Sequence, residues 1–175
     1  MSVEEHKHKH EQVHCMVVTV SDTRTAETDK SGSLMVQLLE EAGHYVTAKE
    51  IVSDESSAIA NKMKAGCENT AVDVILLNGG TGIAHRDVTI ETLAPMLDKE
   101  ITGFGELFRM LSYQEDIGSA AILSRAIGGV IGDTAVFAAP GSSGAVKLAM
   151  NKLIVPELSH VVRELKKDIP GSPPK

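Results

Sequence analysis

The segment Val72–Asp87 (VDVILLNGGTGIAHRD) joins a short apolar run to a loop made mostly of glycine. The run Val72–Leu77 predicts a buried β-strand, and Asn78–Gly82 (NGGTG) follows it directly. Glycines leave backbone N–H groups bare, so an anion can approach them without meeting side chains. A charged pair, Arg86-Asp87, then precedes an expected helix. This layout predicts a phosphate site with a metal carboxylate beside it, although the glycines alone would equally suit a tight turn.

Elsewhere, apolar β-branched runs alternate with segments of helical periodicity, a pattern typical of an α/β sheet. Strands are predicted at 14–20, 45–52, 72–77, 128–131 and 134–139. Helices are predicted at 31–42, at about 54–68 with Ser53 or Asp54 as its cap, and at 88–97, 103–111, 142–152 and 155–166. The strands at 128–131 and 134–139 are expected to form a hairpin at a sheet edge, which makes the parallel sheet a mixed one.

The composition indicates one domain whose core is built from aliphatic residues. The 175-residue chain has no Trp and a formal net charge of −7, which argues against a nucleic-acid partner. No apolar stretch is long enough to cross a membrane. Cys15 and Cys67 form no disulfide or metal pattern, so buried thiols in a reducing, cytoplasmic compartment are expected. Residues 1–12 are predicted to be a mobile His-rich tail, 13–167 the domain, and 168–175 a flexible tail.

Small, polar or glycine residues follow four of the predicted strands. They are Ser21–Arg24, Ser53-Asp54, Asn78–Gly82 and Pro140–Gly144. In open α/β sheets, ligands bind beyond the carboxyl ends of the strands, so these loops are expected to form one site. The chain has neither the dinucleotide fingerprint nor a P-loop, serine-hydrolase elbow or zinc-protease motif, which disfavours those classes.

Four short motifs occur in a fixed order: Thr19–Arg24 (TVSDTR), Gly79–Gly82 (GGTG) with Arg86-Asp87, Leu123–Ala126 (LSRA) and Ala139–Ser142 (APGS). With these motifs the chain resembles the molybdopterin-binding proteins of molybdenum-cofactor synthesis. This family includes MoaB, MogA and the G domain of gephyrin, and the bacterial MoaB branch is the most similar. The resemblance covers roughly residues 13–166.

The resemblance implies a three-layer α/β/α fold and assembly as a trimer, or as a hexamer of paired trimers. It also implies adenylylation of molybdopterin by Mg-ATP, with release of pyrophosphate. Asp87 matches the family's essential aspartate after the glycine loop, and Asp54 matches a second functional aspartate after the second strand. Both are therefore candidate catalytic residues and Mg²⁺ ligands. Other enzymes of the same pathway are candidate partners.

The physical chemistry of the loops agrees with this assignment. Two anions must meet in the reaction, so charge neutralisation and alignment are the main needs. The amides of Gly79–Gly82 are expected to cradle ATP phosphates, and the Pro140–Ser143 loop is assigned to the pterin side. Arg109 and Arg125 are candidate phosphate contacts. The candidate binding residues are Ser21, Asp22, Gly79, Gly80, Thr81, Gly82, Ser124, Pro140, Gly141, Ser142 and Ser143.

Each candidate also has a purely structural interpretation. Asp54, Asp87 and Ser142 could be helix caps, and Asp22 could organise an Asx-turn. Ile83–His85 lacks the proline that adenylylating relatives often place before the arginine. An enzyme and a non-catalytic molybdopterin-binding or carrier protein therefore both remain open. Gly103–Phe108 concentrates two of the few aromatic residues and could serve either an interface or the core.

Overall fold

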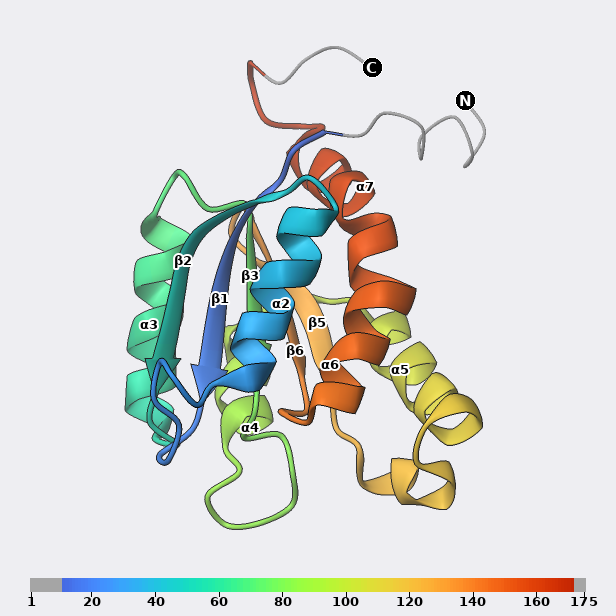
Figure 1. Cartoon of the computed structure of the whole chain (residues 1–175). Coiled ribbons are helices and arrows are strands. Elements are labelled where there is room, and N and C mark those ends of the chain that lie inside the picture. The colour runs from blue at the N-terminus through green and yellow to red at the C-terminus, as the bar shows by residue number, and fades with distance from the viewer. Residues whose placement is uncertain (1–10, 172–175) are drawn as a thin grey trace.

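The computed structural model describes residues 11–171, which build a six-stranded sheet in the order β2-β1-β3-β6-β5-β4 (Figure 1). The strands are β1 (His14–Val20), β2 (Tyr45–Val52), β3 (Val74–Asn78), β4 (Lys99–Glu100), β5 (Ile127–Ile131) and β6 (Thr134–Ala139). Neighbours among β2, β1, β3 and β6 pair in parallel, whereas β5 is antiparallel to both β6 and β4. The predicted mixed, mostly parallel sheet is confirmed.

Helices cover both faces of this sheet. They are α2 (Lys30–Glu41), α3 (Ser56–Glu68), α4 (Thr89–Leu93), α5 (Thr102–Glu115), α6 (Ser143–Ala149) and α7 (Val155–Lys166), with the 3₁₀ segments η1 (Ala94–Met96) and η2 (Gly118–Leu123) and the π-helical turn η3 (Met150–Ile154). None of the helices described is long and apolar enough to cross a membrane.

The side chains of the central strands alternate between two hydrophobic cores, because successive residues of a strand point to opposite faces. In β3, Val74 and Leu76 pack with α2, α5, α6 and α7, whereas Ile75 and Leu77 pack with α3 and α4. Strands β1 and β6 alternate in the same way. Since both faces are buried, the strands read as continuous apolar runs rather than as alternating ones. The three-layer fold is confirmed.

Three of the predicted elements needed correction. The helix expected at 88–97 ends at Leu93 and continues as the 3₁₀ turn η1, which contains Pro95. The two closing helices are joined without a break through the π turn η3, which ends two residues before Pro156, a residue with no N–H to donate. Strands β5 and β6 form the predicted hairpin, but β6 lies inside the sheet and β4 forms the edge. The two residues of β4 are both exposed and carry no apolar signal.

The aromatic residues of Gly103–Phe108 belong to the core. Phe104 is 5% exposed, Phe108 is fully buried, and the ring of Phe104 packs edge-on against Phe137 with centroids 5.0 Å apart. These aromatics therefore give no support for an interface. The predicted tails fall mostly on residues 1–10 and 172–175, which lie outside the described part of the chain.

Candidate functional site

The four parallel strands end at the same edge of the sheet, at the lower end of the molecule in Figure 1. The chain segments at these strand ends contact one another in two pairs, β1 with β2 and β3 with β6. The amide of Ser21 donates to the carbonyl of Val52, and the amide of Gly79 donates to that of Ala139. A Cβ added to Gly141 would lie 3.1 Å from the Cα of Gly79. The predicted convergence of strand ends is therefore real.

The glycine loop has a conformation that side chains would not permit. Gly79 and Gly80 have φ angles of +93° and +65°, in the left-handed region that favours glycine. A Cβ on Gly79 would approach the carbonyl oxygen of Val20 to 2.4 Å, and one on Gly80 would approach Thr89 Oγ1 to 2.4 Å. The loop is thus a tight turn, and the close approach of its neighbours adds a second reason for each glycine.

Three consecutive carbonyls of this loop are held from outside it. Thr89 Oγ1 donates to Gly79 O at 2.9 Å, the Thr89 amide to Gly80 O at 3.0 Å, and Arg125 Nε to Thr81 O at 2.9 Å. Within residues 11–171, the amides of Gly80, Thr81 and Gly82 donate to no acceptor. Successive backbone N–H groups without partners form the kind of concavity that binds anions.

Two aspartates tie the loops after β1 and β2 together. The amide of Asp22 donates to Asp54 Oδ2 at 3.1 Å, and the amide of Asp54 donates to Asp22 Oδ1 at 3.0 Å. Arg86, from the loop after β3, donates to Asp22 Oδ2 and lies 3.7 Å from Glu55 Oε1. These contacts connect three loops through a single charged cluster.

The carboxylate of Asp54 faces the glycine loop. Its Oδ1 would lie 3.2 Å from a Cβ on Gly80. Burial raises the pKa of Asp54, the hydrogen bond from the Asp22 amide lowers it, and the negative charges of Asp22 and Asp87 raise it further, against the lowering effect of Arg86. Asp87 Oδ2 accepts from the amide of Ala84 at 2.9 Å. The site thus concentrates negative charge that a cation would relieve.

These residues fit Mg²⁺ delivered with a nucleotide. Asp54 and Asp87 each use one carboxylate oxygen in a backbone hydrogen bond, and the other accepts none from residues 11–171. No cluster of three or more metal-ligating side chains occurs in this part of the chain, so an ion would need further ligands. Mg²⁺ usually combines one or two carboxylates with phosphate oxygens and water.

The sequence profile of the probable molybdopterin-binding domain family matches residues 16–160. The chain belongs to this family of molybdopterin-binding proteins. Among its relatives, the molybdenum cofactor biosynthesis protein B of Bacillus subtilis is 66% identical over 169 residues, which cover 96% of this chain and 99% of the relative.

Solved structures of the family share its fold. A crystal structure of a molybdenum cofactor biosynthesis protein B superimposes with a TM-score of 0.88 at 63% identity, over 90% of this chain and 98% of the other. The tungsten cofactor synthesizing protein MoaB from Pyrococcus furiosus gives a TM-score of 0.80 at 35% identity, over 89% of this chain and 98% of the other.

Several structural alternatives for the predicted residues can now be decided. Glu55, not Ser53 or Asp54, occupies the cap position of α3, and no side chain caps that helix. Asp87 does not cap α4 but closes the turn that begins at Ala84. Asp22 reaches across to Asp54 rather than forming an Asx-turn, whereas Ser21 Oγ accepts from the amides two and three residues ahead of it.

The remaining predicted residues of this molybdopterin-binding protein are placed less centrally. Ser142 is the N-cap of α6, accepting from the Ala145 amide at 3.2 Å, as its structural interpretation required. Pro140 and Gly141 precede it in the same loop, and Ser143 is the first residue of α6. Ser124 ends η2 and has no hydrogen bond to the other predicted site residues within residues 11–171. Their roles in binding stay predictions.

Two residues support the glycine loop in ways that the sequence did not indicate. Thr89 holds two of its carbonyls, and only its position two residues after Asp87 could have suggested this. Arg125, a candidate phosphate contact, holds the loop backbone through the carbonyl of Thr81. Below the loop, Asn78 Nδ2 donates to Thr19 Oγ1 at 3.0 Å, and that hydroxyl donates to the buried Asp29 at 2.8 Å. These two buried hydrogen bonds hold the end of β3 in place.

Proposed function

We propose that this protein adenylylates molybdopterin with Mg-ATP as a step of molybdenum cofactor biosynthesis. The observation that carries the proposal is the set of three amides at Gly80–Gly82 that find no acceptor within residues 11–171, next to the carboxylates of Asp54 and Asp87. The amides suit the phosphates of the nucleotide, and the two carboxylates suit the cation that accompanies them.

In the proposed reaction, an oxygen of the terminal phosphate of molybdopterin attacks the α-phosphorus of ATP. The new P–O bond forms as the bond from the α-phosphorus to the bridging oxygen breaks, and pyrophosphate leaves with that electron pair. The amides of Gly80–Gly82 would orient the nucleotide and stabilise its negative charge. Asp54 and Asp87 would hold Mg²⁺, which supplies charge neutralisation on the phosphates.

The experiment is an assay of the purified protein with molybdopterin, Mg²⁺ and α-labelled ATP. Adenylylated molybdopterin and one equivalent of pyrophosphate are the expected products. If molybdopterin binds but no adenylylated product forms at any Mg²⁺ concentration, the protein is a carrier and not a transferase. The carrier alternative is favoured by one observation, the hydrogen bond that holds Asp87 Oδ2 to its own turn.

We also propose that the protein assembles as a trimer, or as a hexamer of paired trimers. Support comes from the outer face of α5 and η2, where large apolar side chains remain exposed. They are Leu107, Met110, Tyr113, Ile117, Ile122 and Leu123, with Ile122 84% exposed. Exposed apolar surface of this kind marks interaction sites. Light scattering should give a trimer or a multiple of it, and Tyr113→Glu should reduce the mass; a wild-type monomer at micromolar concentration would contradict the assembly.

A further inference from the structure

The guanidinium group of Arg125 is bound on two sides. Nη1 and Nη2 donate to Oε1 and Oε2 of Glu91 at 2.5 and 3.0 Å, a bidentate pair, while Nε donates to the carbonyl of Thr81 at 2.9 Å. The hydrogen bond to Arg125 lowers the pKa of Glu91, which keeps this carboxylate ionised. Arg125 follows η2, and Glu91 lies on α4, so the pair joins two elements to the glycine loop.

This contact controls the direction of a particular amide. A peptide unit is planar and trans, so the N–H of Gly82 points opposite to the carbonyl of Thr81. Thr89 fixes the two preceding peptide units in the same way through Gly79 O and Gly80 O. Arg125 supplies the third contact, and without it the Thr81–Gly82 peptide would have no partner within residues 11–171 to set its rotation.

We propose that Arg125 and Glu91 are positioning residues that hold the Thr81–Gly82 peptide so that the Gly82 amide faces the nucleotide phosphates. The proposal rests on the proposed function, since it assigns a role in the same nucleotide site. It differs from the expectation that Arg125 contacts phosphate directly, since three of its five N–H groups are directed at Glu91 and Thr81. Arg125 thus acts on ATP through the loop backbone.

The two possible roles of Arg125 predict opposite changes in ATP affinity when Glu91 is substituted. If Arg125 were a phosphate ligand, Glu91→Gln would release its guanidinium and remove a negative charge near a polyanion, so ATP would bind more tightly. If Arg125 is a positioning residue, the same substitution loosens the anchor of the loop, and ATP binds more weakly. Glu91→Gln is nearly isosteric, so a change in ATP affinity would not be caused by lost packing.

The experiment measures Mg-ATP affinity by calorimetry for Glu91→Gln, Arg125→Lys and the double variant. We expect affinity to fall about tenfold in Arg125→Lys, which keeps the charge but loses the Nε donor, and roughly threefold in Glu91→Gln. The double variant should be no weaker than Arg125→Lys, because the pair acts as one unit. Glu50→Gln is the matched control, since it removes the charge that pairs with Lys62 of α3 at 2.6 Å and should leave affinity unchanged.

Hydrogen exchange without nucleotide separates this proposal from the proposed function. The peptide covering the glycine loop should exchange faster in Glu91→Gln and Arg125→Lys than in wild type or Glu50→Gln, with similar melting temperatures. This result would stand even if the wild-type protein bound no ATP, in which case only the proposed function would fail. Unchanged loop exchange, or tighter ATP binding by Glu91→Gln, would overturn the positioning role.

Discussion

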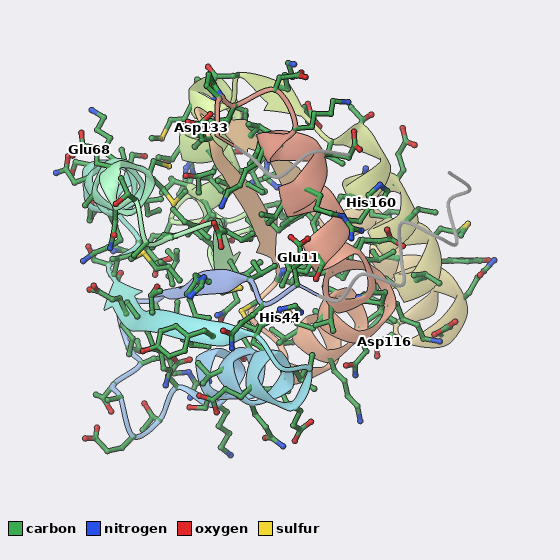
Figure 2. The ribbon with its side chains drawn as sticks, turned by 90° about the horizontal axis from the view of Figure 1, so that it is seen from above. Glu11, His44, Glu68, Asp116, Asp133 and His160 are labelled. Atoms are coloured by element: carbon green, nitrogen blue, oxygen red, sulfur yellow. The ribbon has the colours of Figure 1, made fainter. Side chains whose placement is uncertain are left out.

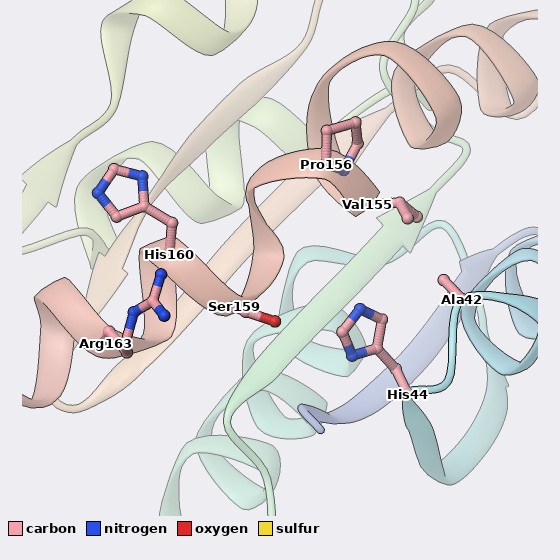
Figure 3. A pocket seen from close by; sticks show the side chains of 7 residues that line it. All are labelled: Ala42, His44, Val155, Pro156, Ser159, His160 and Arg163. Carbon is pink, nitrogen blue, oxygen red and sulfur yellow. The ribbon is translucent and has the colours of Figure 1, made fainter. Parts of the chain in front are cut away.

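The two ends of the sheet differ in shape and in chemistry, and the comparison shows which property locates a site. The carboxyl end has the loops described above. At the opposite end, where β1 and β2 begin, a pocket of about 310 Å³ opens between the end of α2 and helix α7. Its lining residues are Ala42, His44, Val155, Pro156, Ser159, His160 and Arg163 (Figure 3).

The serine and the two histidines of this pocket are bound by the chain itself. The Val13 amide donates to His44 Nδ1 at 3.2 Å, and Ser159 Oγ donates to the carbonyl of Glu11 at 2.8 Å. Figure 2 looks down on this end of the molecule and labels Glu11, His44 and His160. His160 Nδ1 is in turn 3.0 Å from Glu157. These side chains therefore fasten the N-terminal segment to α2 and α7.

At the carboxyl end the situation differs, because three successive backbone donors there have no acceptor within residues 11–171 and several carboxylates lie close together. The amides of Gly80–Gly82 lack acceptors within residues 11–171, and burial and neighbouring charges raise the pKa of Asp54. A fold keeps such groups at a cost in stability, which a ligand can relieve. A hollow surface is thus a weaker indicator of function than unsatisfied groups that converge.

Asp87→Asn is the most severe test of the carboxyl end. Asparagine keeps an acceptor for the Ala84 amide, so the turn should survive, while the charge that attracts Mg²⁺ is lost. We expect adenylylation to fall by about two orders of magnitude with little change in melting temperature. The initial rate with labelled ATP is the measurement, and a wild-type rate would remove Asp87 from the metal site.

Gly80→Ala should weaken ATP binding by about tenfold, because its Cβ would meet Thr89 Oγ1 at 2.4 Å and disturb the loop amides. Gly132→Ala is the matched control: its φ is +56°, and nothing lies within 4 Å of the added Cβ. Both variants should lose about 1 kcal/mol of stability from backbone strain. Calorimetric titration with Mg-ATP separates them, and equal affinities would mean that the loop serves only as a turn.

Asp54→Asn should reduce activity while raising the melting temperature at neutral pH. Because the folded-state pKa of Asp54 is raised, the stability linked to its proton is present at low pH and is lost as the pH rises through that pKa. The neutral side chain of asparagine avoids this loss of stability, but it carries no negative charge to balance that of Mg²⁺. Melting curves from pH 3 to pH 8 should show the gain shrink as the pH falls, and a variant less stable than wild type at pH 7 would contradict the assignment.

Ser159→Ala tests the pocket end and should have the smallest effect. It removes the hydrogen bond to Glu11 O, which is worth about 1 kcal/mol at most at an exposed site, and leaves the glycine loop untouched. Adenylylation and ATP affinity should match wild type. A loss of either would show that the two ends are coupled, and the contrast drawn between them would fail.

The fold could be predicted to a large extent from the chain because its strong signals are local. Strands β1 and β2 were predicted with their observed bounds, since long β-branched runs leave few alternatives. Strand β4 could not be predicted, because two exposed residues join the sheet only when β5 offers a partner. The aromatic residues of α5 left two uses open for a related reason: sequence cannot show whether an apolar side chain faces its own core or a partner.

The loops that form the site were predicted, but the hydrogen bonds between them were not. Each motif indicated a loop, but the reciprocal hydrogen bonds of Asp22 and Asp54 join residues 32 positions apart. Asp54 looked like a helix cap because local sequence favours that use of an aspartate, and a tertiary contact took its place. Arg125 looked like a phosphate contact, and its carbonyl partner lies 44 positions away.

The sequence by itself determined the family, the alternation of strand and helix, and which strands end in loops suited to anions. These depend on hydrophobic period and on residue type at short range. Only the tertiary structure decided which peptide groups stay without partners, which carboxylates face the glycine loop and which arginine holds it in place. These depend on how parallel strands set distant loops side by side, and no local pattern records the rotation of a peptide unit or the neighbour that fixes it.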